Sequence, residues 1–210
     1  NKRQFREVGV VDPSFVYNDM KLTPEEIPIN PDRITVLFTN NAAAQKIPLT
    51  GWTMAHRLGL DASRCIAIDT LFPFGWKQCS VRSIMGTITS TRKTLAMASK
   101  LFSSDGASVA LLGDSPGFIA QRVIGMIVSI ACDMAQQAVA SPKDIDDAVR
   151  IGLGYPVGPL SMGDAIGPTR LLAVMDGLYA TTLEPRYRPS LWLKRRAQVN
   201  VSLLHESVSF

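Results

Sequence analysis

The chain has 210 residues, of which 46% are hydrophobic, and a formal net charge of +4. It can therefore bury a substantial core, and its length suits one large or two small domains. The mild basic excess fits an anionic ligand, a nucleic acid or, most simply, an ordinary soluble surface, so charge alone identifies no partner.

Short apolar runs rich in β-branched residues predict strands in the first half of the chain. The predicted strands are residues 8–11, 34–38, 65–68, 81–89 and 108–112. Helices are predicted over residues 42–58 and 91–102, the second with Leu95, Ala98, Leu101 and Phe102 on one face. Near-continuous apolar strands separated by helices predict an α/β unit whose sheet is covered on both faces.

Only helices are predicted in the second half of the chain. A long helix over residues 115–140 would begin with Ser115 as its N-cap and Pro116 in its first position. Its polar side chains fall on a narrow stripe, so we expect it to be buried over most of its circumference. Further helices are predicted from Ser141 and Pro142 to about residue 151 and over residues 168–183, followed by a basic, then weakly amphipathic tail. We place the domain boundary near residue 113.

The cysteines and the apolar runs favour a cytoplasmic protein. Cys65, Cys79 and Cys132 are far apart and odd in number, with no CxxC and no Cys/His cluster, so we expect buried reduced thiols and no metal site. The apolar run at residues 123–132 is interrupted by a glycine and a serine and is shorter than the ~20 residues of a membrane span. No signal peptide is visible. Because the chain begins with polar residues and not with Met, we expect a piece of a longer protein.

A series of short motifs occupies the second half of the chain. Their residues are Asp114, Ser115, Pro116, Gly117, Phe118, Arg122, the run Asp144-Ile145-Asp146-Asp147-Ala148, Gly152, Gly154, Tyr155, Pro156, Gly158, Pro159, Asp164 and Gly167. In this spacing they resemble the C-terminal helical domain of the 3-hydroxyacyl-CoA dehydrogenase family, over residues 108–183. We expect Ser115 to Phe118, Tyr155, Pro156, Gly158, Pro159 and Asp164 to be structural, with Asp164 capping or orienting the helix at residues 168–183.

The late basic segment, residues 186–196, is similar to one branch of that family. It resembles the end of the long bacterial 3-hydroxybutyryl-CoA dehydrogenases of the phenylacetate-degradation type, in which a full dehydrogenase precedes a reduced Rossmann-like domain and a second helical domain. The resemblance implies a reduced Rossmann-like sheet without a nucleotide motif at residues 1–112. A helical C-terminal domain of the 3-hydroxyacyl-CoA dehydrogenase type would follow at residues 113–210.

The residues at the family's chemical positions do not match its active enzymes. Those enzymes use a His–Glu pair, in which the imidazole removes the hydroxyl proton while hydride passes to NAD⁺. The best alignment of the histidine motif, residues 69–73, puts Asp69 at the His position and Val81 at the Glu position. Gln121 stands at a family Asn position, and residues 41–43 are only a rough counterpart of a substrate-binding Ser-Ser-Leu. We therefore expect no catalytic residue in this chain.

The sequence also lacks the cofactor motif of a dinucleotide-binding fold. That fold needs G-x-G-x-x-G at its first strand–helix turn, and the motif occurs nowhere in the 210 residues. We therefore expect no cofactor on this chain, with NAD and an acyl-CoA substrate bound by the parent enzyme. The expected partners are an upstream dehydrogenase half of the same polypeptide and a second helical domain in a homo-oligomer, with residues 115–140 as the packing helix and no membrane contact.

Two alternatives remain open on the sequence. The first is an autonomous acyl-CoA-binding domain or oxidoreductase that uses Asp69 or His56 as a substitute base, although His56 and His205 are more simply surface or satisfied core histidines. The second is a basic module that binds CoA phosphates, an acidic partner or, less favoured for want of a motif, a nucleic acid. Its cluster would be Arg186, Arg188, Lys194, Arg195 and Arg196.

Overall fold

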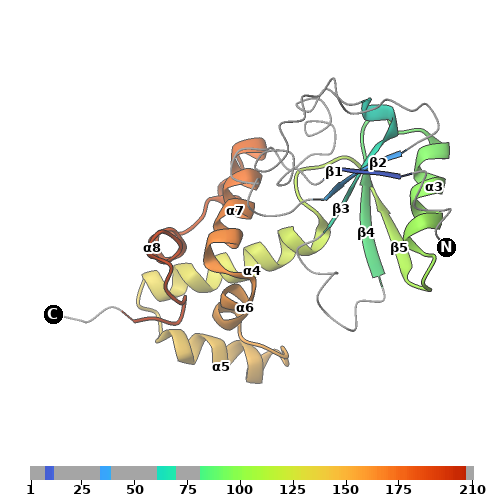
Figure 1. Ribbon diagram of the computed structural model, residues 1–210. Helices are drawn as coiled ribbons and strands as arrows, with labels where there is room; N and C mark the ends of the chain where they lie inside the picture. The colour runs from blue at the N-terminus through green and yellow to red at the C-terminus, as the bar shows by residue number, and fades with distance from the viewer. Residues whose placement is uncertain (1–7, 12–33, 39–60, 70–80, 207–210) are drawn as a thin grey trace. The chain divides into compact units, whose positions relative to one another are not determined.

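The structure is a computed structural model that describes residues 8–11, 34–38, 61–69 and 81–206 (Figure 1). The chain forms two compact units, residues 1–119 and residues 120–210. The division lies a little beyond the boundary predicted near residue 113. The helix predicted over residues 42–58, together with His56 and Cys79, lies outside the described residues.

The first unit contains a five-stranded sheet in the described part of the chain, in the order β1-β2-β3-β4-β5. Its strands are β1 (Val8–Val11), β2 (Ile34–Phe38), β3 (Cys65–Ile68), β4 (Val81–Gly86) and β5 (Ser108–Leu112). The first three strands are parallel, β4 is antiparallel to β3, and β5 is parallel to β4. All five predicted strands are therefore present, and every side chain of β3 is buried, as expected for a strand covered on both faces.

Strand β4 ends three residues earlier than predicted because hydroxyl groups close a turn after Gly86. The Thr87 backbone N–H donates to the Ser90 hydroxyl at 2.7 Å, and the Thr87 hydroxyl donates to the Ala62 carbonyl at 2.6 Å. Ala62 belongs to the short 3-10 helix η3 (Ala62–Arg64), so this turn also fixes the segment before β3. Thr and Ser side chains commonly offer the backbone such alternatives to a strand.

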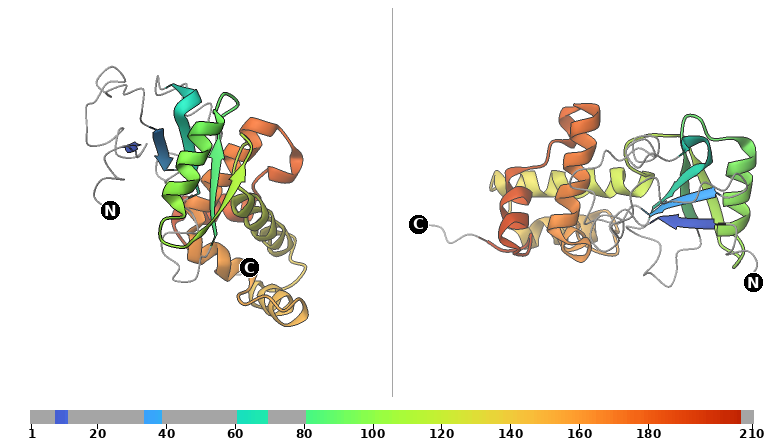
Figure 2. Two further views of the ribbon diagram at one scale, coloured as in Figure 1. Left: turned by 90° about the vertical axis from the view of Figure 1, so that its right-hand side faces the viewer. Right: turned by 45° about the horizontal axis from the view of Figure 1, so that its top comes forward.

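Helix α3 (Arg92–Phe102) packs on one face of the sheet, as Figure 2 also shows. The Thr91 hydroxyl accepts the Thr94 backbone N–H at 3.1 Å and caps the helix. The predicted apolar face is confirmed for Leu95, Ala98 and Phe102, which contact a core of strand isoleucines. These isoleucines are Ile66, Ile68 and Ile84.

The second unit is helical in the described residues. Its helices are α4 (Ile119–Gln136), α5 (Pro142–Gly152), α6 (Pro159–Ile166), α7 (Pro168–Thr182) and α8 (Leu191–Val199), with the 3-10 helix η4 (Pro185–Tyr187). The predicted start of α5 is confirmed, because Ser141 accepts the Asp144 N–H at 3.2 Å and Pro142 takes the first position. Helix α7 also matches its prediction, whereas α6 and α8 were not predicted.

The start predicted for the long helix is wrong. Helix α4 begins at Ile119 and not after Ser115, and Gly117 has a φ of +70°, which lies outside the helical region. The Ser115 hydroxyl donates to the Gly117 carbonyl at 3.4 Å and does not cap the helix. At the other end, Ala138 has a φ of +53° and stops the helix before residue 140.

Two glycines allow the helices of the second unit to approach α4 closely. A Cβ on Gly125 of α4 would lie 2.8 Å from the Met175 sulfur of α7. A Cβ on Gly163 of α6 would lie 2.7 Å from a Val128 methyl group of α4. These distances are shorter than van der Waals contact, so the packing depends on glycine at both positions.

The expectation that α4 is buried over most of its circumference is also wrong. Val123 is 51% exposed and Ile130 is 57% exposed, whereas the polar side chains of Gln121 and Ser129 are buried. Among the described residues, α4 alone has the length and hydropathy of a membrane-spanning helix, a property that core helices share. Because one side of α4 packs on α6 and α7, we interpret it as a helix of the unit with one apolar side left uncovered in this chain.

Candidate functional site

Asp69 and Val81, which we predict at the family's catalytic positions, lie at the end of β3 and at the start of the neighbouring strand β4. Asp69 follows β3, is 2% exposed, and its backbone N–H donates to the Ser83 carbonyl of β4 at 3.1 Å. Val81 begins β4 and is 47% exposed. The family counterparts at residues 41–43 and the rest of the motif at residues 70–73 lie outside the described residues. The side chain of Val81 has no polar atom with which to orient a base.

The described residues do not bring together a set of metal ligands. They contain no group of three His, Cys, Asp or Glu residues with metal-binding geometry. Gln121, at the family Asn position, is buried on α4. His205 is exposed, as expected for a surface histidine.

The motif around Asp146 positions the start of α6. The Asp146 carboxylate accepts the backbone N–H of Leu160 at 2.7 Å and of Ser161 at 2.9 Å, and the side chain is buried. An anion is favoured at a helix N-terminus, where the first N–H groups lack partners within the helix. A Cβ on Gly158 would lie 2.3 Å from the Asp146 Cγ, so only glycine leaves room for this contact. The spacing from Asp146 to Gly158 and Pro159 therefore has a structural explanation that the sequence alone did not reveal.

Asp164 has a structural role, but its partner is not the helix that we expected. It does not cap α7. Its carboxylate accepts the Leu203 backbone N–H at 2.7 Å and the hydroxyl of Ser202. Asp164 therefore ties α6 to the segment after α8.

That segment, residues 200–206 of the predicted amphipathic tail, is held as a C-terminal strap. The Trp192 Nε1–H donates to the Leu203 carbonyl at 2.9 Å, and Leu203 is fully buried. The Arg196 guanidinium donates to the His205 carbonyl, with its Nε at 3.1 Å, and stacks over the Trp192 ring at 3.1 Å from the centroid. These contacts fix the strap on α8.

The other motif positions shape the chain before α4 and α6. Phe118 is 2% exposed and anchors the segment that enters α4. Gly154 has a φ of +70° and begins the turn through Tyr155 and Pro156 that leads to α6. Backbone of this kind favours glycine, which explains that motif position.

The structure divides the predicted basic cluster between two grooves, one lined by Arg195 and Arg196 and the other by Arg186, Arg188 and Lys194. Arg196 is buried and its donors serve the strap, so it is not a free anion contact. Arg186 forms an ion pair with Glu184 at 2.5 Å. Arg195 lines a separate groove of about 370 Å³ beside Trp192 and His205, whereas Arg188 and Lys194 line another groove together with Arg186.

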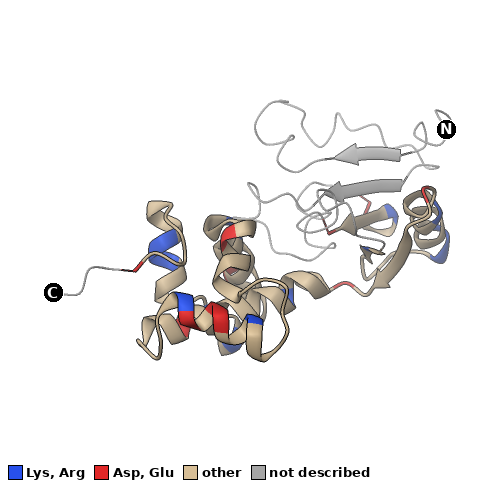
Figure 3. Cartoon of the chain, turned by 90° about the horizontal axis from the view of Figure 1, so that it is seen from below, with Lys and Arg blue, Asp and Glu red and all other residues tan. Residues whose placement is uncertain are grey.

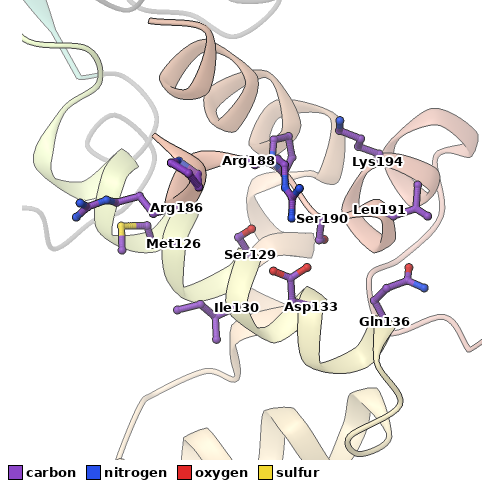
Figure 4. Close-up of a pocket in the computed structure, with 12 residues that line it drawn as sticks. Met126, Ser129, Ile130, Asp133, Gln136, Arg186, Arg188, Ser190, Leu191 and Lys194 are labelled. Carbon is purple, nitrogen blue, oxygen red and sulfur yellow. The ribbon is translucent and has the colours of Figure 1, made fainter. Parts of the chain in front are cut away.

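The second of these grooves, here named the α4–α8 groove, has a volume of about 500 Å³ (Figure 4). One wall is α4 and the other runs from η4 into α8. Figure 4 shows the Asp133 carboxylate, the Arg188 guanidinium and the hydroxyl of Ser129 facing the same space, while Arg186 extends away from them. Burial raises the pKa of Asp133, and the positive charge of Arg188 partly offsets that rise.

Charges of both signs are interspersed on the helical unit (Figure 3). On α5, Asp147 pairs with Lys143 at 2.5 Å and with Arg150 at 3.0 Å. These ion pairs offset the positive charges of Lys143 and Arg150 on α5.

The described cysteines, Cys65 and Cys132, are buried thiols, as predicted. Burial raises the pKa of Cys132 to about 12, which the hydrogen bond with Ser190 only partly opposes. A thiol at such a pKa stays protonated and is a poor nucleophile at neutral pH.

Comparison with known proteins shows which class of protein the helical unit resembles. Residues 117–202 match the family model described as 3-hydroxyacyl-CoA dehydrogenase, C-terminal domain. This range covers nearly the whole described part of the helical unit and includes Asp146, Gly158 and Asp164. Residues 117–202 of this chain are therefore similar to the C-terminal region of 3-hydroxyacyl-CoA dehydrogenases.

Individual relatives extend the likeness to both units. A 3-hydroxyadipyl-CoA dehydrogenase of Escherichia coli K12 is 41% identical over 92 residues, which cover 44% of this chain and 19% of that protein. The crystal structure of a 3-hydroxybutyryl-CoA dehydrogenase from Escherichia coli K12 is 30% identical, with a TM-score of 0.64 over 78% of this chain and 31% of that one. The structure of FadB2 from Mycobacterium tuberculosis, 21% identical, shows the same fold with a TM-score of 0.73 over 92% of this chain and 66% of that one.

The chain thus has the predicted fold class, a reduced Rossmann-like sheet followed by a helical dehydrogenase domain. It spans only a minor part of the two Escherichia coli proteins that it matches.

Proposed function

We propose that this chain is the C-terminal portion of an NAD-dependent 3-hydroxyacyl-CoA dehydrogenase that acts in fatty-acid or aromatic acyl-CoA oxidation in the cytoplasm. Within that enzyme, the chain is a structural module that pairs with another helical domain and does not itself catalyse turnover. The relatives named 3-hydroxyadipyl-CoA and 3-hydroxybutyryl-CoA dehydrogenase support the reaction class. Within the family, the proposal favours the branch of long enzymes, in which a full dehydrogenase precedes a reduced Rossmann-like domain and a second helical domain.

The exposed side of α4 is the observation that carries this proposal. One side of this helix, which we name the pairing ridge, consists of Val123, Ile127, Ile130 and Met134. Val123 and Ile130 are each more than half exposed, although the opposite side of the same helix is tightly packed. Contiguous apolar surface on a folded unit is typical of protein–protein contact. The partner is a second helical domain, from the upstream dehydrogenase half of the same polypeptide or from another copy.

The polar residues of the family motif support an architectural role. The Asp146 carboxylate accepts hydrogen bonds from backbone N–H groups of α6, and the Asp164 carboxylate accepts one from the strap. Groups occupied in this way are not available to a substrate. The motif residues therefore contribute to the folding of the helical domain. We place the catalytic residues elsewhere in the parent enzyme.

The chemical positions support the same conclusion. A general base for this reaction must take a proton from an alcohol, and the family uses an imidazole held by a carboxylate. Here an aspartate stands in place of the imidazole, and the half-exposed Val81 stands in place of the carboxylate. The sequence has no glycine fingerprint for the pyrophosphate of NAD, so we assign the cofactor and acyl-CoA sites to the parent enzyme.

The experiment is to measure acetoacetyl-CoA reduction by NADH with the purified chain, together with NADH binding by calorimetry. The proposal predicts no turnover above the protein-free rate and no saturable NADH binding. Turnover that falls in the Asp69→Ala variant but not in Asp61→Ala would instead support the autonomous enzyme. Asp61 is an exposed residue that caps η3 and serves as the matched control.

A further inference from the structure

Three polar side chains of the α4–α8 groove make no hydrogen bond or ion pair within the described part of the chain. Ser129 is only 4% exposed, yet its hydroxyl opens onto the groove. The Asp133 carboxylate and the Arg188 guanidinium face it across the same space (Figure 4). Asp133 and Arg188 are exposed, and none of the described buried side-chain N or O atoms lacks a partner, so these three groups are open to water in the groove. Together they present a donor, an acceptor and a hydroxyl to a ligand that enters it.

The donor and acceptor properties of these groups define the ligand. A guanidinium only donates, an ionised carboxylate only accepts, and a hydroxyl does either. Arg188 therefore suits an anionic group, and Asp133 suits a hydrogen-bond donor carried by the same molecule. Arg186 takes no part, since Glu184 already neutralises it.

The rest of the lining selects among molecules of that kind. Lys194 lies at the groove and adds a positive charge, so the three charged groups around the space favour an anion over a zwitterion. Met126, Ile130 and Leu191 supply an apolar surface for a short aliphatic part. The volume of about 500 Å³ is within the range of small-molecule clefts.

We propose that the α4–α8 groove binds a small hydroxycarboxylate, with its carboxylate on Arg188 and its hydroxyl between Asp133 and Ser129. The site lies beside the pairing ridge and shares only Ile130 with it. The proposal does not depend on whether the chain pairs or catalyses.

The test is an amide NMR titration of the full chain with 3-hydroxybutyrate, and with butyrate as the analogue that lacks the hydroxyl. We expect saturable shifts centred on Ser129 and Asp133, with butyrate binding roughly five-fold more weakly because one hydrogen bond is lost. Equal affinities for the two acids would overturn the assignment of the hydroxyl. The absence of saturation at tens of millimolar, or shifts centred outside the groove, would overturn the site.

Variants distinguish binding in the groove from a general effect of removing a positive charge. Arg188→Gln is expected to weaken 3-hydroxybutyrate binding by about ten-fold, because a charge-assisted hydrogen bond is removed. Arg170→Gln, an exposed position on α7 outside the groove, is the matched control and should bind as the wild type does. Ser129→Ala is a second variant that preserves the helix, and several-fold weaker binding is expected. Unchanged binding in Arg188→Gln or in Ser129→Ala would contradict the proposal.

Discussion

At the scale of single residues, Asp146 shows how the family motif works. Its two carboxylate oxygens accept the first free N–H groups of α6, and the side chain is buried from water. Loss of the carboxylate would leave those N–H groups without a partner in a buried place. Each hydrogen bond to a charged group contributes about 1.5–3 kcal/mol, so this one residue is a large part of the stability of α6.

We predict that Asp146→Ala lowers the free energy of local opening at α6 by about 2–4 kcal/mol. Hydrogen exchange of the Leu160 and Ser161 amides measures this directly. Asp147→Ala is the matched control, because that neighbouring side chain makes only exposed ion pairs, which contribute little to stability. Equal protection of α6 in the two variants would show that the cap is not needed.

Cys132 provides a prediction on pH dependence. Its pKa is raised to about 12, so the reactive thiolate is scarce at every pH at which the chain is handled. We predict that iodoacetamide alkylates Cys132 far more slowly in the native chain than in urea. Raising the pH from about 7 to 9 should increase the rate strongly only in urea, where the pKa is near 8.5. Peptide-resolved mass spectrometry makes the measurement, and comparable native and unfolded rates would contradict the burial of this thiol.

At the scale of elements, the C-terminal strap completes the helical unit. Leu203 is fully buried, and the methyl group of its side chain lies close to Gly163 of α6. Three polar contacts, from Asp164, Trp192 and Arg196, hold the strap in that position. The strap therefore joins α6 to α8, two short helices that could not be stable alone.

We predict that Leu203→Ala destabilises α6 and α8 by about 2–4 kcal/mol, because it leaves a cavity at their contact. The control is Leu204→Ala, which truncates the adjacent and much more exposed leucine. Hydrogen exchange of the two helices should increase only in the first variant. Similar exchange in both variants would mean that the strap lies on the unit without supporting it.

The elements also show what the sequence could predict. The strands and α3 follow from β-branched and amphipathic runs, and α5 follows from the cap formed by Ser141 and Pro142. Helices α6 and α8 are too short for a clear periodicity, although Pro159 and Ser190 stand at their starts. The predicted start of α4 is too early because Ser115 and Pro116 resemble a helix cap. The positive φ of Gly117, which excludes a helix there, is imposed by the turn and is not specified by the neighbouring sequence.

The candidate site was harder to predict than the fold, because tertiary contacts determine which residues line the groove and which are buried elsewhere. Arg188 and Arg196 look alike in sequence, yet only the second meets a carbonyl of the strap. Ser129 and Asp133 belong to a distant helix and have no sequence signal that joins them to Arg188. Asp146 lay within a recognised motif, but its role required the position of α6.

At the scale of the whole molecule, the chain joins a Rossmann-like unit and a dehydrogenase helical domain in one polypeptide. Asp146 of the motif holds the start of α6, and the sequence predicts Asp69 and Val81 at the family's His and Glu positions. Among the exposed aliphatic residues of the described helical unit, Val123 and Ile130 lie together on the pairing ridge of α4. We therefore expect this chain to contribute assembly to its parent enzyme.

Sedimentation equilibrium of the purified chain tests that claim most directly. The account predicts a reversible dimer whose dissociation constant rises at least about ten-fold in Val123→Glu, because a charge would be buried in the ridge contact. Ile151→Glu, which changes an exposed aliphatic residue of α5 away from the ridge, should leave the dimer unchanged. A monomer at all concentrations, or a dimer that Val123→Glu does not weaken, would contradict the account.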